Sequence, residues 1–126
     1  MSLRKKKILL IEDDRFLAGM YEKKLILDGF LVHVAHDGLE GIQEIRSFRP
    51  HVVLLDLLLP KKSGFEVLRV LKAKKTTASI PVIVLSNLSQ TQDVERCMKM
   101  GASDYLVKSH FLPSEVLQKI QSAIAS

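Results

Sequence analysis

The sequence predicts an α/β domain in which a parallel sheet is covered by helices on both faces. Short apolar runs recur five times along the 126 residues, and a stretch with helical spacing of apolar residues follows each run. Glycine, proline or charged residues separate the two kinds of segment. Strands and helices that alternate in this way form right-handed βαβ units, which place parallel strands side by side between two layers of helices.

The five apolar runs define the expected strands. Each run is short and is bounded by residues that favour turns, as expected for strands buried on both faces of a parallel sheet. Pro60 prevents pairing beyond the third run, because proline lacks the backbone N–H that a sheet requires. The expected strands are Lys6–Ile11, Phe30–Val34, Val52–Leu55, Ile80–Leu85 and Tyr105–Val107.

The five helices are marked by apolar residues three and four positions apart. Asp14 is suited to cap the first helix, Pro50 ends the second, Gly101 suits the end of the fourth, and Pro113 lies near the start of the fifth. The apolar positions are Phe16, Leu17, Met20, Tyr21, Leu25 and Leu27 in the first helix, Leu39, Ile42, Ile45 and Phe48 in the second, Val67, Leu68 and Leu71 in the third, Val94, Cys97 and Met98 in the fourth, and Val116, Leu117, Ile120 and Ile124 in the fifth.

The composition is that of one soluble globular domain. The chain is 47% hydrophobic and 26% charged, and no apolar run approaches the roughly 20 residues of a membrane helix. The basic N-terminus is not followed by the apolar region of about 7–15 residues that a secretory signal needs. Cys97 is the only cysteine, which excludes an internal disulfide and suits a reducing compartment. We therefore expect one domain, residues 1–126, in the cytoplasm and away from membranes.

The net charge of +5 does not by itself indicate a nucleic-acid-binding surface. The basic residues are spread along the chain, without interleaved aromatic residues or a recognisable DNA-reading motif. We interpret them as solvated surface and expect no direct binding of this domain to nucleic acid.

Four of the five strands end in chemically distinctive residues. Glu12 and Asp13 follow the first strand, Asp56 follows the third, Ser86 the fourth and Lys108 the fifth. The carboxyl ends of parallel strands lie at one edge of the sheet, where α/β proteins place their functional groups. These residues, far apart in the chain, are therefore expected to form one site.

The residue types at this edge indicate phosphoryl chemistry assisted by Mg²⁺. Clustered carboxylates repel one another, so they must share protons or bind a cation. Mg²⁺ prefers oxygen ligands and keeps water or phosphate oxygens beside one or two protein carboxylates. With Mg²⁺ and Lys108, the charges of Glu12, Asp13 and Asp56 are balanced. A carboxylate can attack phosphorus to form an acyl phosphate, while a metal, a lysine and a serine hydroxyl stabilise the phosphoryl oxygens.

Other chemistries lack their motifs. Neither of the glycine-rich nucleotide-binding motifs occurs in the chain. His33 and His36 have no further ligand nearby in the sequence, which argues against a zinc site. We expect Cys97, Met98 and Met100 to pack in the core.

These features together resemble the receiver domain of two-component response regulators over the whole chain. The resemblance implies a doubly wound (βα)5, flavodoxin-like three-layer sandwich with a parallel five-stranded sheet of order 2-1-3-4-5. The matching residues are Glu12, Asp13, Asp14, Asp56, Pro60, Gly64, Ser86, Tyr105 and Lys108.

The resemblance implies roles for the residues at the sheet edge. Asp56 would accept a phosphoryl group from the phosphohistidine of a sensor histidine kinase or a histidine phosphotransfer protein. Asp13, Asp56 and the backbone carbonyl of Leu58 would bind Mg²⁺, and Glu12 would act mainly through water. Lys108 would contact the phosphoryl group. Such a domain is a phosphoacceptor in signalling, whose own catalysis is limited to its phosphorylation and slow dephosphorylation.

The resemblance also implies a switch. Ser86 would move toward the phosphoryl group and Tyr105 would turn inward into the vacated space. The surface formed by the fourth helix, the fifth strand and the fifth helix would then change its partners. The partner would be a downstream protein, an effector domain or a second copy of this chain; the sequence fits a stand-alone receiver and a domain of a longer protein equally well.

Three positions depart from the family pattern. Asn87 follows Ser86 where the family usually has a small residue, which narrows the expected phosphoryl pocket. Ser109 follows Lys108 where proline is usual, often after a cis peptide bond. A cis bond before serine costs about 3 kcal/mol, so we expect a trans bond and a differently shaped loop. Phe111 lies one residue late, consistent with a one-residue insertion.

Two leucines suggest a long-lived acyl phosphate. Leu58 and Leu88 lie two residues past Asp56 and Ser86, at positions expected to flank the phosphoryl group. Polar side chains there could orient a hydrolytic water, whereas leucines hinder it.

Two other functions compete with a phosphorylated receiver. One is a binding module of the same fold that works without phosphorylation, which Asn87 and the altered loop after Lys108 favour. The other is a Mg²⁺-dependent phosphatase of the haloacid dehalogenase type. That class would require an aspartate two residues after the nucleophile, where this chain has Leu58.

Overall fold

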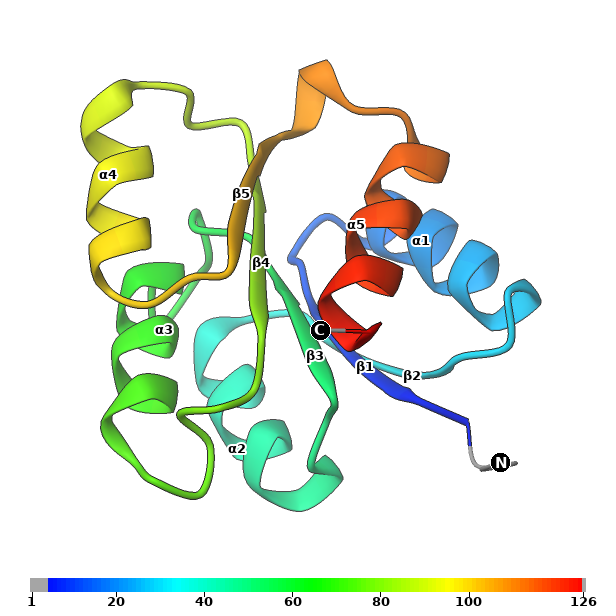
Figure 1. The fold of residues 1–126 in the computed structure, drawn as a ribbon, viewed down its shortest axis with the longest axis horizontal. Helices are drawn as coiled ribbons and strands as arrows, with labels where there is room; N and C mark the ends of the chain where they lie inside the picture. Colours follow the sequence, from blue (N-terminus) through cyan, green and yellow to red (C-terminus); the bar gives the residue numbers. More distant parts are fainter. Residues whose placement is uncertain (1–4, 126) are drawn as a thin grey trace.

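The computed structural model describes residues 5–125 as one five-stranded sheet between two layers of helices (Figure 1). Strands and helices alternate along the chain, and one 3-10 turn precedes the last helix. The strands are β1 (Lys7–Ile11), β2 (Leu31–Ala35), β3 (Val52–Leu55), β4 (Val82–Ser86) and β5 (Asp104–Val107). The helices are α1 (Arg15–Leu27), α2 (Gly38–Phe48), α3 (Gly64–Ala73), α4 (Thr91–Lys99) and α5 (Pro113–Ala125), and the 3-10 turn is η1 (Lys108–His110).

The sheet has the expected order and direction. All neighbouring strands are parallel, and their order is β2-β1-β3-β4-β5. The change of direction between β1 and β3 is the topological switch point, beside which open α/β sheets bind ligands. In the register of β1 against β3, Ile11 lies opposite Leu55. The residue that follows each of them is acidic, so the register fixes which acids meet.

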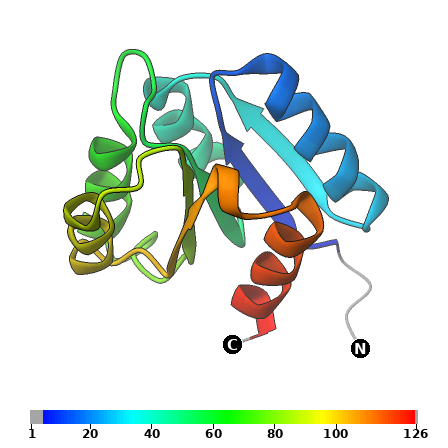
Figure 2. The same ribbon diagram turned by 90° about the horizontal axis from the view of Figure 1, so that it is seen from above.

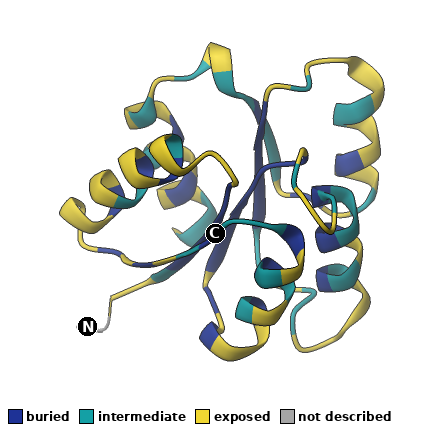
Figure 3. Ribbon diagram, turned by 180° about the vertical axis from the view of Figure 1, so that it is seen from behind, coloured by how far each residue is buried: buried dark blue, intermediate teal, exposed yellow. Residues whose placement is uncertain are grey.

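Helices cover both faces of the sheet (Figures 1 and 2), and a separate apolar cluster is buried on each face. On one face Ile45 of α2, Leu71 of α3 and Cys97 of α4 pack against the strands. On the other face Leu25 of α1 and Ile120 of α5 do so. The central strands are buried on both faces, as Figure 3 shows, which explains their uninterrupted apolar sequences.

The strands lie close to the expected positions. β1 begins one residue later than expected, and β5 begins one residue earlier. β4 begins at Val82 rather than Ile80, because Pro81 has no N–H for the ladder and contributes only its carbonyl, which accepts from the N–H of Val53. β2 is shifted by one residue, to Leu31–Ala35.

The helix ends follow local chemistry. The side chain of Asp14 caps α1 by accepting a hydrogen bond of 3.0 Å from the N–H of Leu17, as predicted. Gly101 follows α4 with φ of 104°, a left-handed conformation that glycine adopts without strain.

The apolar face of α1 was assigned correctly only in part: Tyr21 and Leu25 are buried and Leu17 packs against the core. Phe16 and Leu27 are 86% and 83% exposed, and Met20 is also exposed. Ala18, which the spacing did not single out, also lies on the buried face. The spacing of threes and fours fits more than one face of this helix, because large apolar residues occur on two sides of it. The exposed residues therefore form an apolar surface.

The expectation for the sulfur-containing side chains of α4 holds in part. Cys97 is fully buried and Met100 packs against the core, as predicted. Met98 is 43% exposed, so its assignment to the core was wrong.

The loop after β5 has the expected trans backbone. No cis peptide bond occurs among residues 5–125, so Lys108 and Ser109 are joined in trans. The turn η1 takes up this segment, and Phe111 then packs partly buried against the α1–α5 side of the core. Within the same residues no helix is long and apolar enough to cross a membrane.

Candidate functional site

The acids after β1 and β3 meet at the carboxyl edge of the sheet. The backbone N–H of Asp56 donates to the carbonyl of Ile11 at 3.0 Å, so the ladder between these strands continues to the acidic residues. Glu12, Asp13 and Asp56 each place a carboxylate oxygen within 4.8 Å of the others. Glu12 and Asp56 are 3% and 6% exposed, whereas Asp13 is exposed. Three carboxylates are thus gathered at the rim of a buried strand pair.

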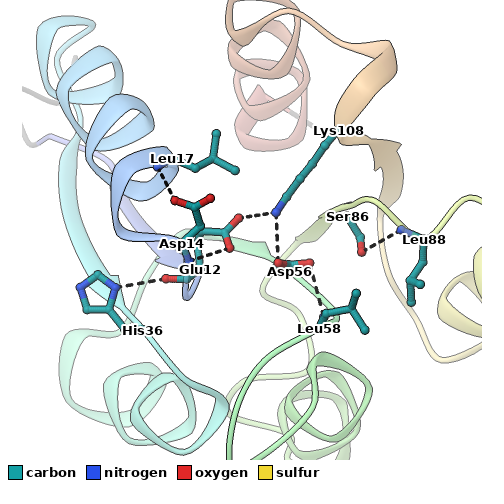
Figure 4. A network of polar contacts seen from close by, with 9 residues as sticks. All are labelled: Glu12, Asp14, Leu17, His36, Asp56, Leu58, Ser86, Leu88 and Lys108. Atoms are coloured by element: carbon teal, nitrogen blue, oxygen red, sulfur yellow. Dashed lines mark hydrogen bonds and ion pairs between the residues drawn. The ribbon is translucent and has the colours of Figure 1, made fainter.

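Lys108 completes the cluster from the end of β5. Its ammonium group lies 2.5 Å from Glu12 Oε1 and 3.1 Å from Asp56 Oδ2 (Figure 4). Among residues 5–125 the carboxylate of Asp13 makes no hydrogen bond or ion pair. One lysine therefore links two of the acids and leaves the third available to a further cation.

The protonation equilibria reflect this crowding. Burial raises the pKa of Glu12 to about 7; the hydrogen bond from Lys108 lowers it and the charge of Asp56 raises it further. Burial alone would lower the pKa of Lys108, but its contacts with Glu12 and Asp56 outweigh burial and raise it. Lys108 therefore remains charged, and burial opposes the ionisation of Glu12.

The loop after Asp56 is packed tightly against it. The N–H of Leu58 approaches Asp56 Oδ1 at 3.4 Å (Figure 4). Gly64 begins α3, and a Cβ atom there would lie 2.3 Å from the carbonyl oxygen of Asp56 and 2.5 Å from the Cα of Leu57. Gly64 is therefore required at the start of α3, because the backbone of Asp56 and Leu57 leaves no room there for a Cβ atom.

Ser86 and Tyr105 are joined through the loop after β4. Ser86 is fully buried, and its Oγ accepts a hydrogen bond of 3.3 Å from the N–H of Leu88. The hydroxyl of Tyr105 donates to the carbonyl of Leu88 at 2.6 Å. Burial raises the pKa of Tyr105 to about 12, and a hydrogen bond with Ser86 lowers it in part. Ser86 of β4, Tyr105 of β5 and Leu88 in the loop between β4 and α4 therefore form one polar network.

His36 and Asp14 support Glu12 in ways that the sequence did not indicate. His36 Nδ1 donates to the backbone carbonyl of Glu12 at 3.1 Å, and the N–H of Asp14 donates to Glu12 Oε2 at 3.2 Å. His36 follows β2, which pairs with β1, so strand order combined with chain position could have placed it beside Glu12. Neither histidine named in the sequence analysis joins a metal cluster within residues 5–125, since His33 pairs with Glu44.

A model of the response regulator receiver domain family matches residues 8–121. The chain belongs to this family. The match extends from β1 into α5 and includes every residue of the cluster.

Curated relatives of this receiver domain include full-length response regulators. The chain is 35% identical over 124 residues to the DNA-binding response regulator MtrA of Mycobacterium tuberculosis. That alignment covers 98% of this chain and 53% of the relative. The chain thus spans about half the length of the curated relatives that it matches.

Solved receiver domains have the same architecture. The receiver domain of a Francisella response regulator superimposes with a TM-score of 0.89 at 28% identity, covering 96% of this chain and 98% of the other. The receiver domain of a sensor histidine kinase from Pseudomonas aeruginosa PAO1 gives a TM-score of 0.88 at 28% identity and covers 98% and 100% of the two chains. The latter structure is described with a magnesium ion coordinated in the active site cleft.

The donor set of this receiver domain fits a magnesium ion. Opposite ligands of one Mg²⁺ lie about 4.2 Å apart, since each bond is about 2.1 Å long. The carboxylate oxygens of Glu12, Asp13 and Asp56 lie within 4.8 Å of one another, only slightly beyond this largest ligand spacing, so one ion can reach two of them directly and the third through water. The clustering matches the acidic magnesium site of receiver domains in its residue types.

Proposed function

We propose that this receiver domain accepts a phosphoryl group on Asp56 from the phosphohistidine of a sensor histidine kinase or a histidine phosphotransfer protein. The observation that carries the proposal is the position of Asp56. Its carboxylate ends a buried strand beside Glu12 and Asp13, and Lys108 lies 3.1 Å from it. These are the parts that phosphoryl transfer to a carboxylate requires.

The transfer conserves charge and atoms in one displacement. An oxygen of Asp56 forms a bond to phosphorus as the bond between phosphorus and the imidazole nitrogen of the donor breaks. The electron pair of that bond returns to the imidazole, which takes up a proton from solvent. Lys108 holds the attacking carboxylate in place and then neutralises negative charge on the phosphoryl oxygens.

Mg²⁺ would be held by Asp13, Asp56 and the backbone carbonyl of Leu58. Glu12 would contribute mainly through water. Both of its carboxylate oxygens already have partners, because one pairs with Lys108 and the other accepts from the N–H of Asp14. When bound, the ion would supply positive charge to the phosphoryl oxygens. Asp13 is the acid best placed to give its full charge to the metal, because no other described residue pairs with it.

The response to phosphorylation would pass through Ser86 and Tyr105. Ser86 would move to donate its hydroxyl to a phosphoryl oxygen and so leave its contacts with Leu88 and Tyr105. Tyr105 would turn further inward, and the surface of α4, β5 and α5 would change its affinity for partners. We propose as partner a downstream protein, an effector domain or a second copy of the chain.

To bring its phosphohistidine to Asp56, the donor protein must bind over the carboxyl edge of the sheet. Two elements border this edge, the start of α1 and the segment before α5, and both expose large apolar side chains. Phe16 is 86% exposed and Leu112 is 65% exposed, and Pro113 contributes to a groove along α1. We propose this apolar surface as the docking site of the phosphohistidine protein.

Intact-protein mass after incubation with acetyl phosphate tests the proposal. With Mg²⁺ the wild-type chain should gain the mass of one phosphoryl group, and without Mg²⁺ it should gain little. Asp56→Asn should abolish the gain, whereas the matched control Asp28→Asn, an exposed acid at the end of α1, should leave it unchanged. A gain that persists in Asp56→Asn would refute Asp56 as the acceptor.

Two features of the loops keep a second function in contention. Asn87 follows Ser86, and η1 reshapes the segment after Lys108, so the proposed switch surface differs from the common family pattern. A binding module that works without phosphorylation would bind its partner equally well as wild type and as Asp56→Asn. A phosphatase would instead hydrolyse simple phosphate monoesters, although Leu58 offers no side-chain acid at the position where that class requires one.

A further inference from the structure

A cavity of about 530 Å³ lies between α2 and α3, away from the acidic cluster. Pro50 and Ile80, which precede β3 and β4, both line it. The cavity therefore opens at the amino edge of the sheet, whereas the acids lie at the carboxyl edge. Its volume is within the range of about 300–1,000 Å³ that small-molecule sites occupy.

The inner wall of the cavity is apolar. Side chains of α2 and α3 form it, among them Ile42, Ile45, Val70 and Leu71. Ile45 and Leu71 belong to the buried core, and Ile42 and Ile80 pack against it. The apolar part of a ligand would cover this wall and remove its apolar surface from water, as folding does for the core.

The segment that closes the cavity is held in place by hydrogen bonds. The ammonium group of Lys72 donates to the carbonyls of Ala78 and Ile80, each at 2.8 Å. The hydroxyl of Thr77 donates to the carbonyl of Leu71 at 2.5 Å. These bonds fix residues 77–80 against α3, so the wall does not have to be ordered when a ligand enters.

The rim of the cavity is cationic. Arg46, Arg49 and Lys74 line it, and no acidic residue does. None of the three makes an ion pair with another of residues 5–125. Arg49 in addition holds a left-handed backbone conformation, with φ of 54°, which glycine or asparagine adopts more easily.

We propose that this cavity binds a small amphiphilic carboxylate, a molecule with one apolar chain or ring and one carboxylate group. The apolar wall would take the chain and the cationic rim the carboxylate. A polyanion such as nucleic acid would leave the apolar wall unused, and a neutral apolar molecule would leave the three cations unused. The proposal is independent of phosphorylation, because the cavity and Asp56 lie at opposite edges of the sheet.

Titration with sodium octanoate, followed by two-dimensional amide NMR of the whole chain, tests this assignment. Saturable shifts are expected at residues 46–49 and 74–80, at octanoate concentrations below micelle formation. Butyrate keeps the carboxylate but has a shorter chain, and 1-octanol keeps the chain but has no charge. Each is expected to bind at least about fivefold more weakly, because one loses buried methylene groups and the other loses the charge interaction.

Two variants and one control locate the site. Arg46→Glu with Arg49→Glu should weaken octanoate binding by about fivefold or more, and Val70→Phe should weaken it by filling the cavity. Lys23→Glu with Lys24→Glu makes the same charge change along the α1 groove and should leave the affinity unchanged. The absence of saturable shifts, equal affinity for 1-octanol, or an equal loss in the α1 control would overturn the proposal. Failure of Asp56 phosphorylation would leave these outcomes unaffected.

Discussion

The hydroxyl of Tyr105 donates a 2.6 Å hydrogen bond to the backbone carbonyl of Leu88 and so ties β5 to the loop that follows β4. The N–H of Leu88 in turn donates to Ser86 Oγ. Because burial raises the pKa of Tyr105 to about 12, its hydroxyl keeps its proton throughout the neutral range. The network therefore holds both residues of the proposed switch in one arrangement.

Tyr105→Phe is expected to lower the free energy of unfolding by about 0.5–1.5 kcal/mol, because the ring is kept while one hydrogen bond is lost. Urea denaturation followed by circular dichroism measures the change. Tyr21→Phe is the matched control, since the buried Tyr21 makes no side-chain hydrogen bond among residues 5–125. Equal losses in the two variants would show that the bond to Leu88 contributes nothing specific.

Gly64→Ala is expected to destabilise the domain by about 1–3 kcal/mol, because the added Cβ meets backbone atoms that cannot move aside easily. The same variant should slow phosphorylation of Asp56, whose carbonyl oxygen would lie 2.3 Å from that Cβ. Gly19→Ala is expected to stabilise the chain. Nothing lies within 4 Å of the Cβ position of Gly19 on α1, and the higher helix propensity of alanine should contribute about 0.5–1 kcal/mol. Thermal unfolding of both variants checks the two signs.

Glu12 should make stability depend on pH in the absence of Mg²⁺. Its pKa is about 7 in the folded chain against an ordinary value of 4.5, so the folded state binds more protons than the unfolded state between these values. Stability should therefore fall as pH rises through this window. The full shift, which already includes the lowering by Lys108, corresponds to at most roughly 3 kcal/mol. Urea unfolding at several pH values should show a flatter dependence for Glu12→Gln; an unchanged slope would contradict the assignment.

The lifetime of the acyl phosphate should depend on Leu58 and Leu88. Leu58 is 58% exposed and its N–H lies next to the carboxylate of Asp56, while Leu88 lies next to Ser86. Leu58→Asn combined with Leu88→Glu should speed dephosphorylation, because polar groups can position a hydrolytic water. Loss of the phosphoryl mass over time measures the rate. Leu58→Val with Leu88→Val keeps both positions apolar and should leave the rate close to that of the wild type.

Phe16→Ser should separate the two routes of phosphorylation. The exposed ring of Phe16 can contribute to docking of a protein donor but is not needed by a small one. Transfer from a phosphohistidine protein should slow by about tenfold or more, as for a well-buried aromatic contact, while phosphorylation by acetyl phosphate should be unchanged. Leu27→Ser alters an equally exposed residue at the far end of α1. A loss with acetyl phosphate as well would point to damage of the site rather than of docking.

Much of the fold could be predicted from the sequence, because several independent patterns indicate the same alternation of strands and helices. Five apolar runs and five helical patterns fix the alternation of elements, and strand ends in a parallel sheet share one edge. The location of Glu12, Asp13, Asp56 and Lys108 in one cluster therefore needed no side-chain detail. The strand order followed from the family resemblance and not from the apolar pattern.

The remaining features depend on packing that a linear pattern does not encode. The large apolar residues of α1 occur on two sides of the helix, so spacing alone could not choose between Phe16 and Tyr21 as the buried residue. The contact of Tyr105 with Leu88 joins two positions 17 residues apart, and neither residue type indicates the other. The cavity between α2 and α3 depends on how two helices diverge, which no local sequence signal reports.

The register between β1 and β3 would make the proposed metal site a reporter of correct folding. Ile11 lies opposite Leu55, so only this register sets Glu12 beside Asp56, and a slip of one residue would turn every β3 side chain to the other face of the sheet. A chain with a misaligned β3 would therefore present no complete set of acids. Mg²⁺ would stabilise only the correctly paired molecules, and the fraction of a preparation that binds the ion would measure the fraction whose central strands are in register.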